Sequence, residues 1–557
     1  MTLFVKSKLS LLVLVIFTYL PEGLFAQSEE NYQQIDVLHY TFRLEVSDAH
    51  NRIEATADIL FKTRSRALET TYFDLIAFDA ESKTGMKVSE VKLNDKVINF
   101  EQKADRLYLH VSPGLKSGEI GTFNVSYEGV PEDGLIISEN EYGERTFFGD
   151  NWPNRARHWL PTHDHPSDKA TCEFIIITPA QYKVIANGTL REESMLSYRG
   201  EEARKLTHWV MAQPIPTKVM VFGAARFAVL YDQAVQDIPI QHWVYADNRD
   251  SGFQDFEQTA NILQYFIDRI GDYPYDKLAN VESKTRYGGM ENASNIFYNE
   301  QAVDGTQSIE ALIAHEVAHQ WFGNSISEKE WKDIWLSEGF ATYMSHTYLE
   351  KTYGEDTLAA VLKEDKEKVF SYYQRVPEST VVDDSQENIY LLLNANSYQK
   401  GAWFLHMLRL KIGDLTFWKG IKSYYRKYGH TKANTQDFKN MMESLSGESL
   451  EAFFDLWLYS PGHPILKGDW KYSVMGKKLK ISLEQVQEND KIYDLPLEVA
   501  IYYKAGTEPT IEKIRLDTRS ARFTLKLKAR PLKVEFDPRA RVLVDTKLIK
   551  PQAGQVR

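Results

Sequence analysis

Hydrophobic and polar residues alternate over much of the first half of the chain. Segments 39–46 and 106–111, for example, place apolar residues at every second position, as strands with one buried face do. Clusters of Asp, Asn, Gly and Pro separate these segments and are typical of turns. From Asp36 to about Tyr245 the pattern therefore predicts a large, mostly antiparallel β domain.

The period of the pattern changes near Arg249. Residues 256–270 carry apolar side chains at helical spacing, and further helical segments follow to about residue 458. Pro461 and Gly462 interrupt this region, and short alternating segments return after them. We expect a multidomain α+β protein with three units, at residues 27–246, 247–462 and 463–557, the last a small β-sandwich.

The first 26 residues have the layout of a secretory signal peptide. Lys6 and Lys8 precede an apolar run over 9–20, and Ala26 offers a plausible cleavage point. The run is too short to cross a bilayer comfortably, and an uncleaved membrane anchor is the alternative. The single cysteine, Cys172, cannot form an intrachain disulfide. We predict an exported bacterial protein, periplasmic or secreted, with no transmembrane span once the signal peptide is removed.

Composition narrows the classes of function. The 557 residues include 66 Lys and Arg against 78 Asp and Glu, which gives a formal net charge of −12. This acidic balance gives no support to nucleic-acid binding, which depends on basic surfaces. With one cysteine, any metal ion would have to be held by histidines and carboxylates.

The predicted helical unit carries a His-Glu-x-x-His motif. His315 and His319 are four residues apart, so a helix places both imidazoles on one face, where they can bind one Zn²⁺. Glu316 lies about 100° further around the helix, where it can act as general base on a water molecule. Glu338 follows 19 residues after His319 on a second predicted helix over 331–350. Two histidines and a glutamate leave a coordination position open, as catalytic zinc sites do; the alternative is that Glu338 is a solvated helix residue.

Two further segments are candidates for contacts with a substrate. Paired glycines at 288 and 289 allow a close approach of the backbone, and the carboxylate of Glu291 beside them could bind a free α-amine. The phenol of Tyr398 could donate a hydrogen bond to an oxyanion. From spacing alone, an ordinary turn remains open for the first segment and a core tyrosine is the better explanation of the second.

The three motifs together resemble the M1 family of zinc aminopeptidases (gluzincins). They are Gly-Gly-Met-Glu-Asn at 288–292, His-Glu-x-x-His at 315–319 with Glu338 beyond it, and Tyr-x-Lys-Gly-Ala at 398–402. Segment 155–171 resembles that family's N-terminal signature, and the resemblance covers about residues 34–545. It implies an N-terminal β-saddle domain, a thermolysin-like and mainly helical catalytic domain, and a small C-terminal β-sandwich.

The resemblance also implies an activity, a cofactor and roles for individual residues. We expect hydrolysis of the first peptide bond of peptides with a free N-terminus, with one Zn²⁺ per chain. The implied zinc ligands are His315, His319 and Glu338, the implied catalytic residues are Glu316 and Tyr398, and the implied substrate-binding residues are Gly288, Gly289, Met290, Glu291 and Asn292. Among these, Glu291 is expected to anchor the α-amine of the substrate.

Two of the chain's departures from the family pattern bear on the surroundings of the substrate site. Many members carry a Gln that helps to hold the substrate amine, whereas segment 148–153 contains none, and Asp150 or Asn151 are the candidates to replace it. The sequence also ends after the predicted β-sandwich, which implies a short form without the family's C-terminal helical domain. The preferred N-terminal residue, the peptide length and the oligomeric state are not fixed by the sequence.

Two alternatives to a simple aminopeptidase remain. A bifunctional epoxide hydrolase and aminopeptidase similar to leukotriene A4 hydrolase would share the zinc site. Segment 388–394, however, offers no carboxylate where that enzyme has its epoxide-directed aspartate. A non-catalytic binding module on the same scaffold is expected to have lost ligands, whereas this sequence retains all of them.

Overall fold

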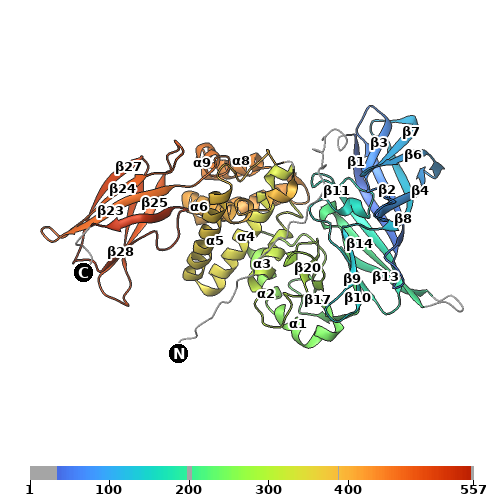
Figure 1. Ribbon diagram of the computed structural model, residues 1–557, viewed down its shortest axis with the longest axis horizontal. Helices are drawn as coiled ribbons and strands as arrows, with labels where there is room; N and C mark the ends of the chain where they lie inside the picture. Colours follow the sequence, from blue (N-terminus) through green and yellow to red (C-terminus); the bar gives the residue numbers. More distant parts are fainter. Residues whose placement is uncertain (1–33, 197–202, 387, 553–557) are drawn as a thin grey trace.

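The computed structural model describes residues 34–196, 203–386 and 388–552. Three groups of elements follow one another along an elongated molecule, with a β-rich unit at each end and the helices between them (Figure 1). The predicted signal peptide lies outside the described residues. None of the helices in the described part of the chain combines the length and apolarity that a membrane span requires.

The N-terminal β-rich unit is built around an eight-stranded sheet. Alternating residues bury one face of its central strands, as Tyr40, Phe42 and Leu44 do on β1. The strand order is β13-β14-β11-β1-β2-β8-β4-β5, in which β1 and β11 form the parallel pair. The strands are β1 (Ile35–Glu45), β2 (Ile53–Thr63), β4 (Gly85–Leu93), β5 (Lys96–Val97), β8 (Ile120–Val130), β11 (Lys169–Pro179), β13 (Thr189–Leu196) and β14 (Arg204–Pro216).

Two smaller sheets complete this unit. A three-stranded sheet has the order β3-β7-β6, and a four-stranded sheet has the order β12-β15-β10-β9. Their strands are β3 (Ala67–Asp74), β6 (Asn99–Lys103), β7 (Arg106–Lys116), β9 (Leu135–Glu139), β10 (Arg145–Gly149), β12 (Lys183–Ala186) and β15 (Phe222–Ala225).

A mixed five-stranded sheet joins this β-rich unit to the helices. Its order is β16-β17-β18-β20-β19, with strands β16 (Phe227–Tyr231), β17 (Ile240–Tyr245), β18 (Leu278–Ser283), β19 (Gly289–Met290) and β20 (Asn295–Asn299). Strand β17 pairs in parallel with β18, so the sheet runs across residue 246, where the sequence predicts a boundary. Alternation marks β16 and β17 as strands but does not show which sheet they join.

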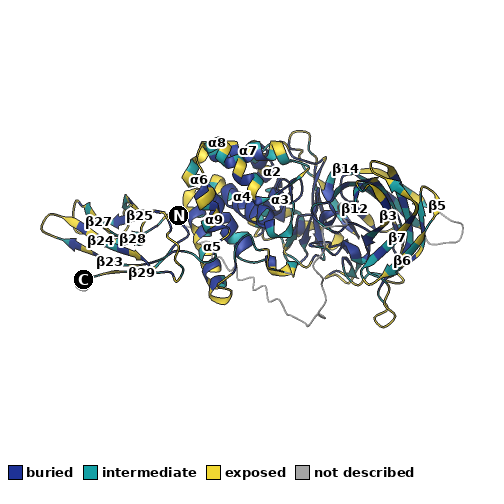
Figure 2. Ribbon diagram, turned by 90° about the horizontal axis from the view of Figure 1, so that it is seen from above, coloured by how far each residue is buried: buried dark blue, intermediate teal, exposed yellow. Residues whose placement is uncertain are grey.

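The middle of the molecule is helical, as the apolar spacing predicts. Its helices are α1 (Arg249–Asp255), α2 (Thr259–Arg269), α3 (Glu310–His319), α4 (Trp335–Tyr353), α5 (Glu355–Arg375), α6 (Gly401–Ile412), α7 (Asp414–Tyr428), α8 (Thr435–Ser446) and α9 (Glu451–Trp457). Residues 335–348 of α4 are all buried, which makes α4 the central helix of the unit (Figure 2). A two-stranded pairing of β21 (Ser327–Glu328) with β22 (Lys432–Ala433) lies beside these helices.

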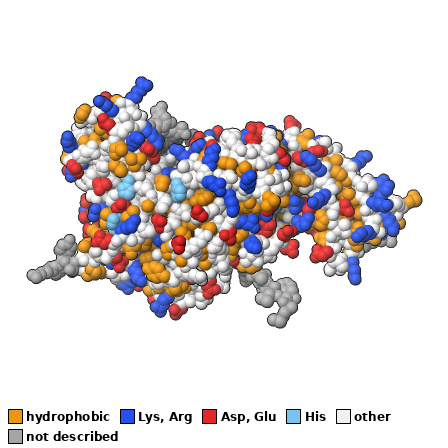
Figure 3. All heavy atoms as spheres, turned by 180° about the vertical axis from the view of Figure 1, so that it is seen from behind, with side chains coloured by type: hydrophobic (Ala, Val, Ile, Leu, Met, Phe, Trp, Pro, Cys, Tyr) orange, Lys and Arg blue, Asp and Glu red, His pale blue; other side chains and the backbone are white. Residues whose placement is uncertain are grey.

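The C-terminal β-rich unit begins at β23, shortly after the Pro-Gly break. Two sheets form it, with the orders β27-β24-β23-β29 and β26-β25-β28. The strands are β23 (Ile465–Ser473), β24 (Lys478–Gln485), β25 (Leu495–Tyr502), β26 (Thr510–Leu516), β27 (Ser520–Lys526), β28 (Lys533–Phe536) and β29 (Asp545–Pro551). Basic and acidic side chains are interspersed over the face of the molecule shown in Figure 3.

Candidate metal centre and active site

The His-Glu-x-x-His motif lies on α3, and α4 brings Glu338 beside it. The Nε2 atoms of His315 and His319 are 3.0 Å apart. Oε2 of Glu338 is 3.6 Å from the first and 3.3 Å from the second. A tetrahedral ion with ligands at about 2.0–2.1 Å separates its donor atoms by about 3.3 Å. The three side chains therefore fit one Zn²⁺, and the 3% exposure of Glu338 excludes a solvated helix residue.

Contacts behind the donor atoms fix the orientation of His319. Its Nδ1 donates to the carbonyl oxygen of Phe322 at 3.0 Å and lies 3.1 Å from Oγ of Ser337. With its proton on Nδ1, the ring presents the lone pair of Nε2 to the metal position. Gly323 closes this turn at φ +112°, where an added Cβ would lie 2.2 Å from Oγ of Ser337. Only glycine fits here without displacing the support of His319.

The carboxylates around His319 favour its protonated form when no metal competes. Burial lowers the pKa of His319, but the carboxylates of Glu338 and Glu291 outweigh burial and raise the pKa to about 10. Burial also opposes ionisation of Glu338, yet the two imidazoles bring the pKa of Glu338 well below its usual range. The site is therefore electrostatically prepared for a cation, and a proton and a metal ion compete for it.

Glu316 occupies the position expected of a general base. It is buried, and its Oε2 has no hydrogen-bond partner among the described residues. Burial is the main cause that raises the pKa of Glu316 well above its ordinary value. Strand β19 packs directly against the side chain, because a Cβ on Gly289 would lie 2.4 Å from Oε1 of Glu316. The second glycine of the pair therefore makes room for the carboxylate.

Among the described residues, one carboxylate oxygen of Glu291 is unpaired close to the candidate metal site. Its main-chain carbonyl accepts hydrogen bonds from Gln320 Nε2 at 3.0 Å and from Asn324 Nδ2 at 2.6 Å, which fix its position. The side chain is 5% exposed, and within the described ranges its Oε1 has no partner. Burial, helped by Glu338, raises the pKa of Glu291. A buried and unpaired carboxylate is costly unless a cationic ligand completes it.

These side chains line one cavity of about 380 Å³. All of the expected metal and catalytic residues line this cavity. Of the expected substrate-binding residues, Gly288, Gly289, Met290 and Glu291 line it as well. Asn292 is buried and is not among the lining residues. Further residues line the cavity that the sequence motifs do not identify, some beside the motifs and others, such as Trp152 and Lys368, from distant segments. They are Trp152, Tyr287, Ala311, Leu312, Thr342, Ser345, His346, Asp365, Lys368, Leu393 and Gln399.

Tyr398 reaches the cavity from a π-helical turn, Asn396–Lys400, that precedes α6. Its ring is nearly parallel to the imidazole of His315, with ring centroids 6.1 Å apart. Gly339 on α4 lets the turn and α6 approach, because an added Cβ would lie 3.0 Å from the carbonyl oxygen of Ser397 and 2.9 Å from Cα of Gly401. Burial, followed by the nearby carboxylates, raises the pKa of Tyr398 well above 10. The phenol therefore keeps its proton and can act as a hydrogen-bond donor.

The two candidates to replace the missing Gln have other partners. The carboxylate of Asp150 forms an ion pair with Arg155 at 2.9 Å. The side chain of Asn151 accepts a hydrogen bond from Nε1 of Trp159 at 2.8 Å and donates one to the carbonyl oxygen of Met220. Neither residue lines the cavity, whereas the neighbouring Trp152 does.

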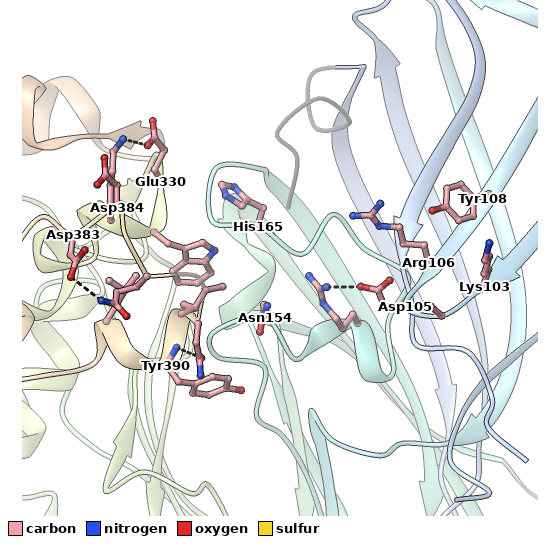
Figure 4. Close-up of a pocket in the computed structure, with 18 of the residues that line it drawn as sticks. Lys103, Asp105, Arg106, Tyr108, Asn154, His165, Glu330, Asp383, Asp384 and Tyr390 are labelled. Carbon is pink, nitrogen blue, oxygen red and sulfur yellow. Dashed lines mark hydrogen bonds and ion pairs between the residues drawn. The ribbon is translucent and has the colours of Figure 1, made fainter. Parts of the chain in front are cut away.

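A larger cavity of about 650 Å³ lies between the N-terminal β-rich unit and the helices. Figure 4 shows Glu330, Asp383 and Asp384 on the helical side and Lys103 and Arg106 on the other. None of the candidate metal ligands lines this cavity, so the smaller cavity is the candidate active site.

Comparison with known families supports this assignment. The description "Peptidase M1 N-terminal domain" matches residues 36–219, and "Peptidase family M1 domain" matches residues 254–457. Together the matches cover well over half of the chain.

Two curated proteins illustrate the similarity. The leucyl aminopeptidase of Saccharolobus solfataricus is 25% identical over 497 residues, which cover 82% of this chain and 59% of that protein. The glutamyl aminopeptidase of Mus musculus is 28% identical over 396 residues, which cover 67% of this chain and 40% of that protein. The chain thus spans about half the length of these relatives.

Two solved structures share the fold. Aminopeptidase A of Legionella pneumophila superposes with a TM-score of 0.77 at 16% identity, over 92% of this chain and 59% of that one. An M1 zinc metallopeptidase of Deinococcus radiodurans superposes with a TM-score of 0.66 at 24% identity, over 76% of this chain and 94% of that one. These similarities confirm the fold, a β-rich N-terminal unit followed by a helical unit.

Proposed function

The chain belongs to peptidase family M1, and from this premise we propose that it is a zinc aminopeptidase that removes single residues from the N-termini of peptides. Zinc is the family's cofactor, and His315, His319 and Glu338 would bind one ion per chain. When bound, the ion supplies a Lewis acid that polarises the scissile carbonyl and increases the acidity of water.

The protein's own residues supply the rest of the reaction. Glu291 binds the α-ammonium group of the substrate and so positions the first peptide bond beside the metal ligands. Glu316 accepts a proton from the attacking water at its unpartnered Oε2 and delivers it to the leaving amine. The protonated phenol of Tyr398 donates to the oxyanion that develops on the carbonyl oxygen. Met290, Trp152 and Tyr287 supply apolar lining in the same cavity.

The observation that carries this proposal is the buried carboxylate of Glu291 in the cavity of the candidate metal ligands, whose Oε1 has no partner among the described residues. It favours cleavage next to a free amine over cleavage within a chain. The test is to incubate the zinc-loaded protein with an unblocked decapeptide and to identify the products by mass spectrometry over time. A ladder that loses one residue at a time from the N-terminus is expected, whereas internal fragments would indicate an endopeptidase.

The predictions on location and domain organisation belong to the same proposal. The apolar run at 9–20 supports a signal peptide cleaved after Ala26 and export to the periplasm or medium. We describe the three units as a β-saddle, a thermolysin-like domain and a β-sandwich, divided near residues 246 and 462. Nothing in the described part of the chain favours the epoxide hydrolase or the non-catalytic module, since segment 388–394 contains no carboxylate and the ligand set is complete.

A further inference from the structure

A second, open groove of about 500 Å³ continues from the active-site cavity along α5. Lys368 and Leu393 line both the cavity and the groove. The other lining residues of the groove are Glu367, Ser371, Tyr372, Arg375, Asn394 and Ala395. On α5, positions 368, 371, 372 and 375 follow helical spacing, so they share one face of the helix.

The groove lies on the side of the metal site away from Glu291. Helix α5 packs against α4, α4 packs against α3, and α3 packs against β19, the strand next to Glu291. The metal-ligand candidates on α3 and α4 therefore stand between Glu291 and α5. If Glu291 binds the α-amine, as the proposed function states, the part of the peptide beyond the scissile bond extends toward α5.

Lys368 and Arg375 give the groove an accessible positive charge. Lys368 is 58% exposed and donates to Asp365 at 3.1 Å, but that carboxylate also binds His346 at 2.7 Å. Glu367, the acidic residue of the groove, pairs with Lys547 at 2.8 Å. Arg375 is exposed and forms no ion pair within residues 34–196, 203–386 and 388–552. Two cations thus follow one another along the exit from the active site.

The spacing of these cations corresponds to a short peptide. Seven helical positions separate Lys368 from Arg375, which places their backbones about 10 Å apart. An extended peptide covers this distance in about three residues. We propose that the groove binds the C-terminal carboxylate of short peptides, of about four to six residues, and so selects them as substrates of the proposed aminopeptidase.

The test compares one unblocked pentapeptide as its free acid and as its C-terminal amide. Binding of both forms is measured by calorimetry on the zinc-loaded Glu316→Gln variant, and turnover is measured on the parent protein. The free acid is expected to bind about threefold to tenfold more tightly, as an exposed charge-assisted hydrogen bond allows. Adding Arg375→Gln to that variant should reduce this ratio to near one. The control is Lys363→Gln, because Lys363 is an exposed residue of α5 that lies outside the groove. This substitution also removes one positive charge, but it should preserve the ratio of the two affinities.

Equal affinity of the two forms, or a ratio that survives both Arg375→Gln and Lys368→Gln, would overturn this inference. Failure of the proposed function has a different signature, because it would abolish the turnover of all unblocked substrates whatever their C-terminus.

Discussion

Replacing Gly289 with alanine tests how the backbone positions the general base. The added Cβ would lie 2.4 Å from Oε1 of Glu316 and 2.6 Å from its Cγ and Cδ. Ordinary contacts between such atoms are about 3.5–4.0 Å, so the carboxylate must move by about 1 Å. A displacement of this size in an active site costs about 100-fold in rate. We therefore expect Gly289→Ala to lower kcat about 100-fold while the protein remains folded and zinc-loaded.

Gly288→Ala is the matched control, because its Cβ would contact only Cδ2 of Leu312, at 3.7 Å. Its loss of activity should be much the smaller of the two. The assay is hydrolysis of an unblocked amino-acid amide, with zinc content measured by atomic absorption and folding by thermal denaturation. If both variants lost activity equally while zinc and folding were preserved, the close contact of Gly289 with Glu316 would not position the base.

Four other changes test individual roles. Glu316→Gln should retain zinc and lose about 10²–10⁴-fold in kcat, and near-normal turnover would refute its role as the base. Glu291→Ala should lower kcat/KM for free-amine amides about 10–100-fold, and unchanged kinetics would remove the amine anchor. Tyr398→Phe should lower kcat about 10²–10³-fold with little change in KM; the reverse pattern would indicate ground-state binding. Because the metal-free pKa of His319 is about 10, zinc must displace a proton from this imidazole when it binds. The affinity of the protein for zinc, measured by competition with a chelator, should therefore increase about tenfold per pH unit between pH 6 and 8. An affinity that does not change with pH would contradict this competition between proton and metal.

Part of the candidate metal site could be predicted from the sequence, because helix periodicity relates two of its three ligands. A spacing of four residues places His315 and His319 on one face, and the buried surroundings of Glu338 were evident from its apolar neighbours. The resemblance to the M1 family, carried by three short motifs, is confirmed by the family matches. The helices expected over 256–270 and 331–350 are α2 and α4, the latter preceded by a 3₁₀ turn at Trp331–Asp333.

Features that depend on long-range packing could not be predicted. Strands β16 and β17 pair into the sheet of the helical unit, and local alternation cannot reveal their partners. Asn292 belongs to the motif but is not among the residues that line the cavity. Lys368 and Trp152 reach the cavity from α5 and from the N-terminal unit, and only the fold brings them there. Sequence spacing reports neighbours on one element, whereas these contacts join different elements.

The most direct test of the account is a paired assay on the zinc-loaded protein. Initial rates are measured for an unblocked amino-acid amide and for its N-acetylated twin, before zinc is chelated, after chelation and after zinc is restored. We predict rapid cleavage of the free-amine compound only, loss of that cleavage when zinc is removed and recovery when zinc is restored. Cleavage of the acetylated twin at a similar rate, or activity that persists without zinc, would contradict it.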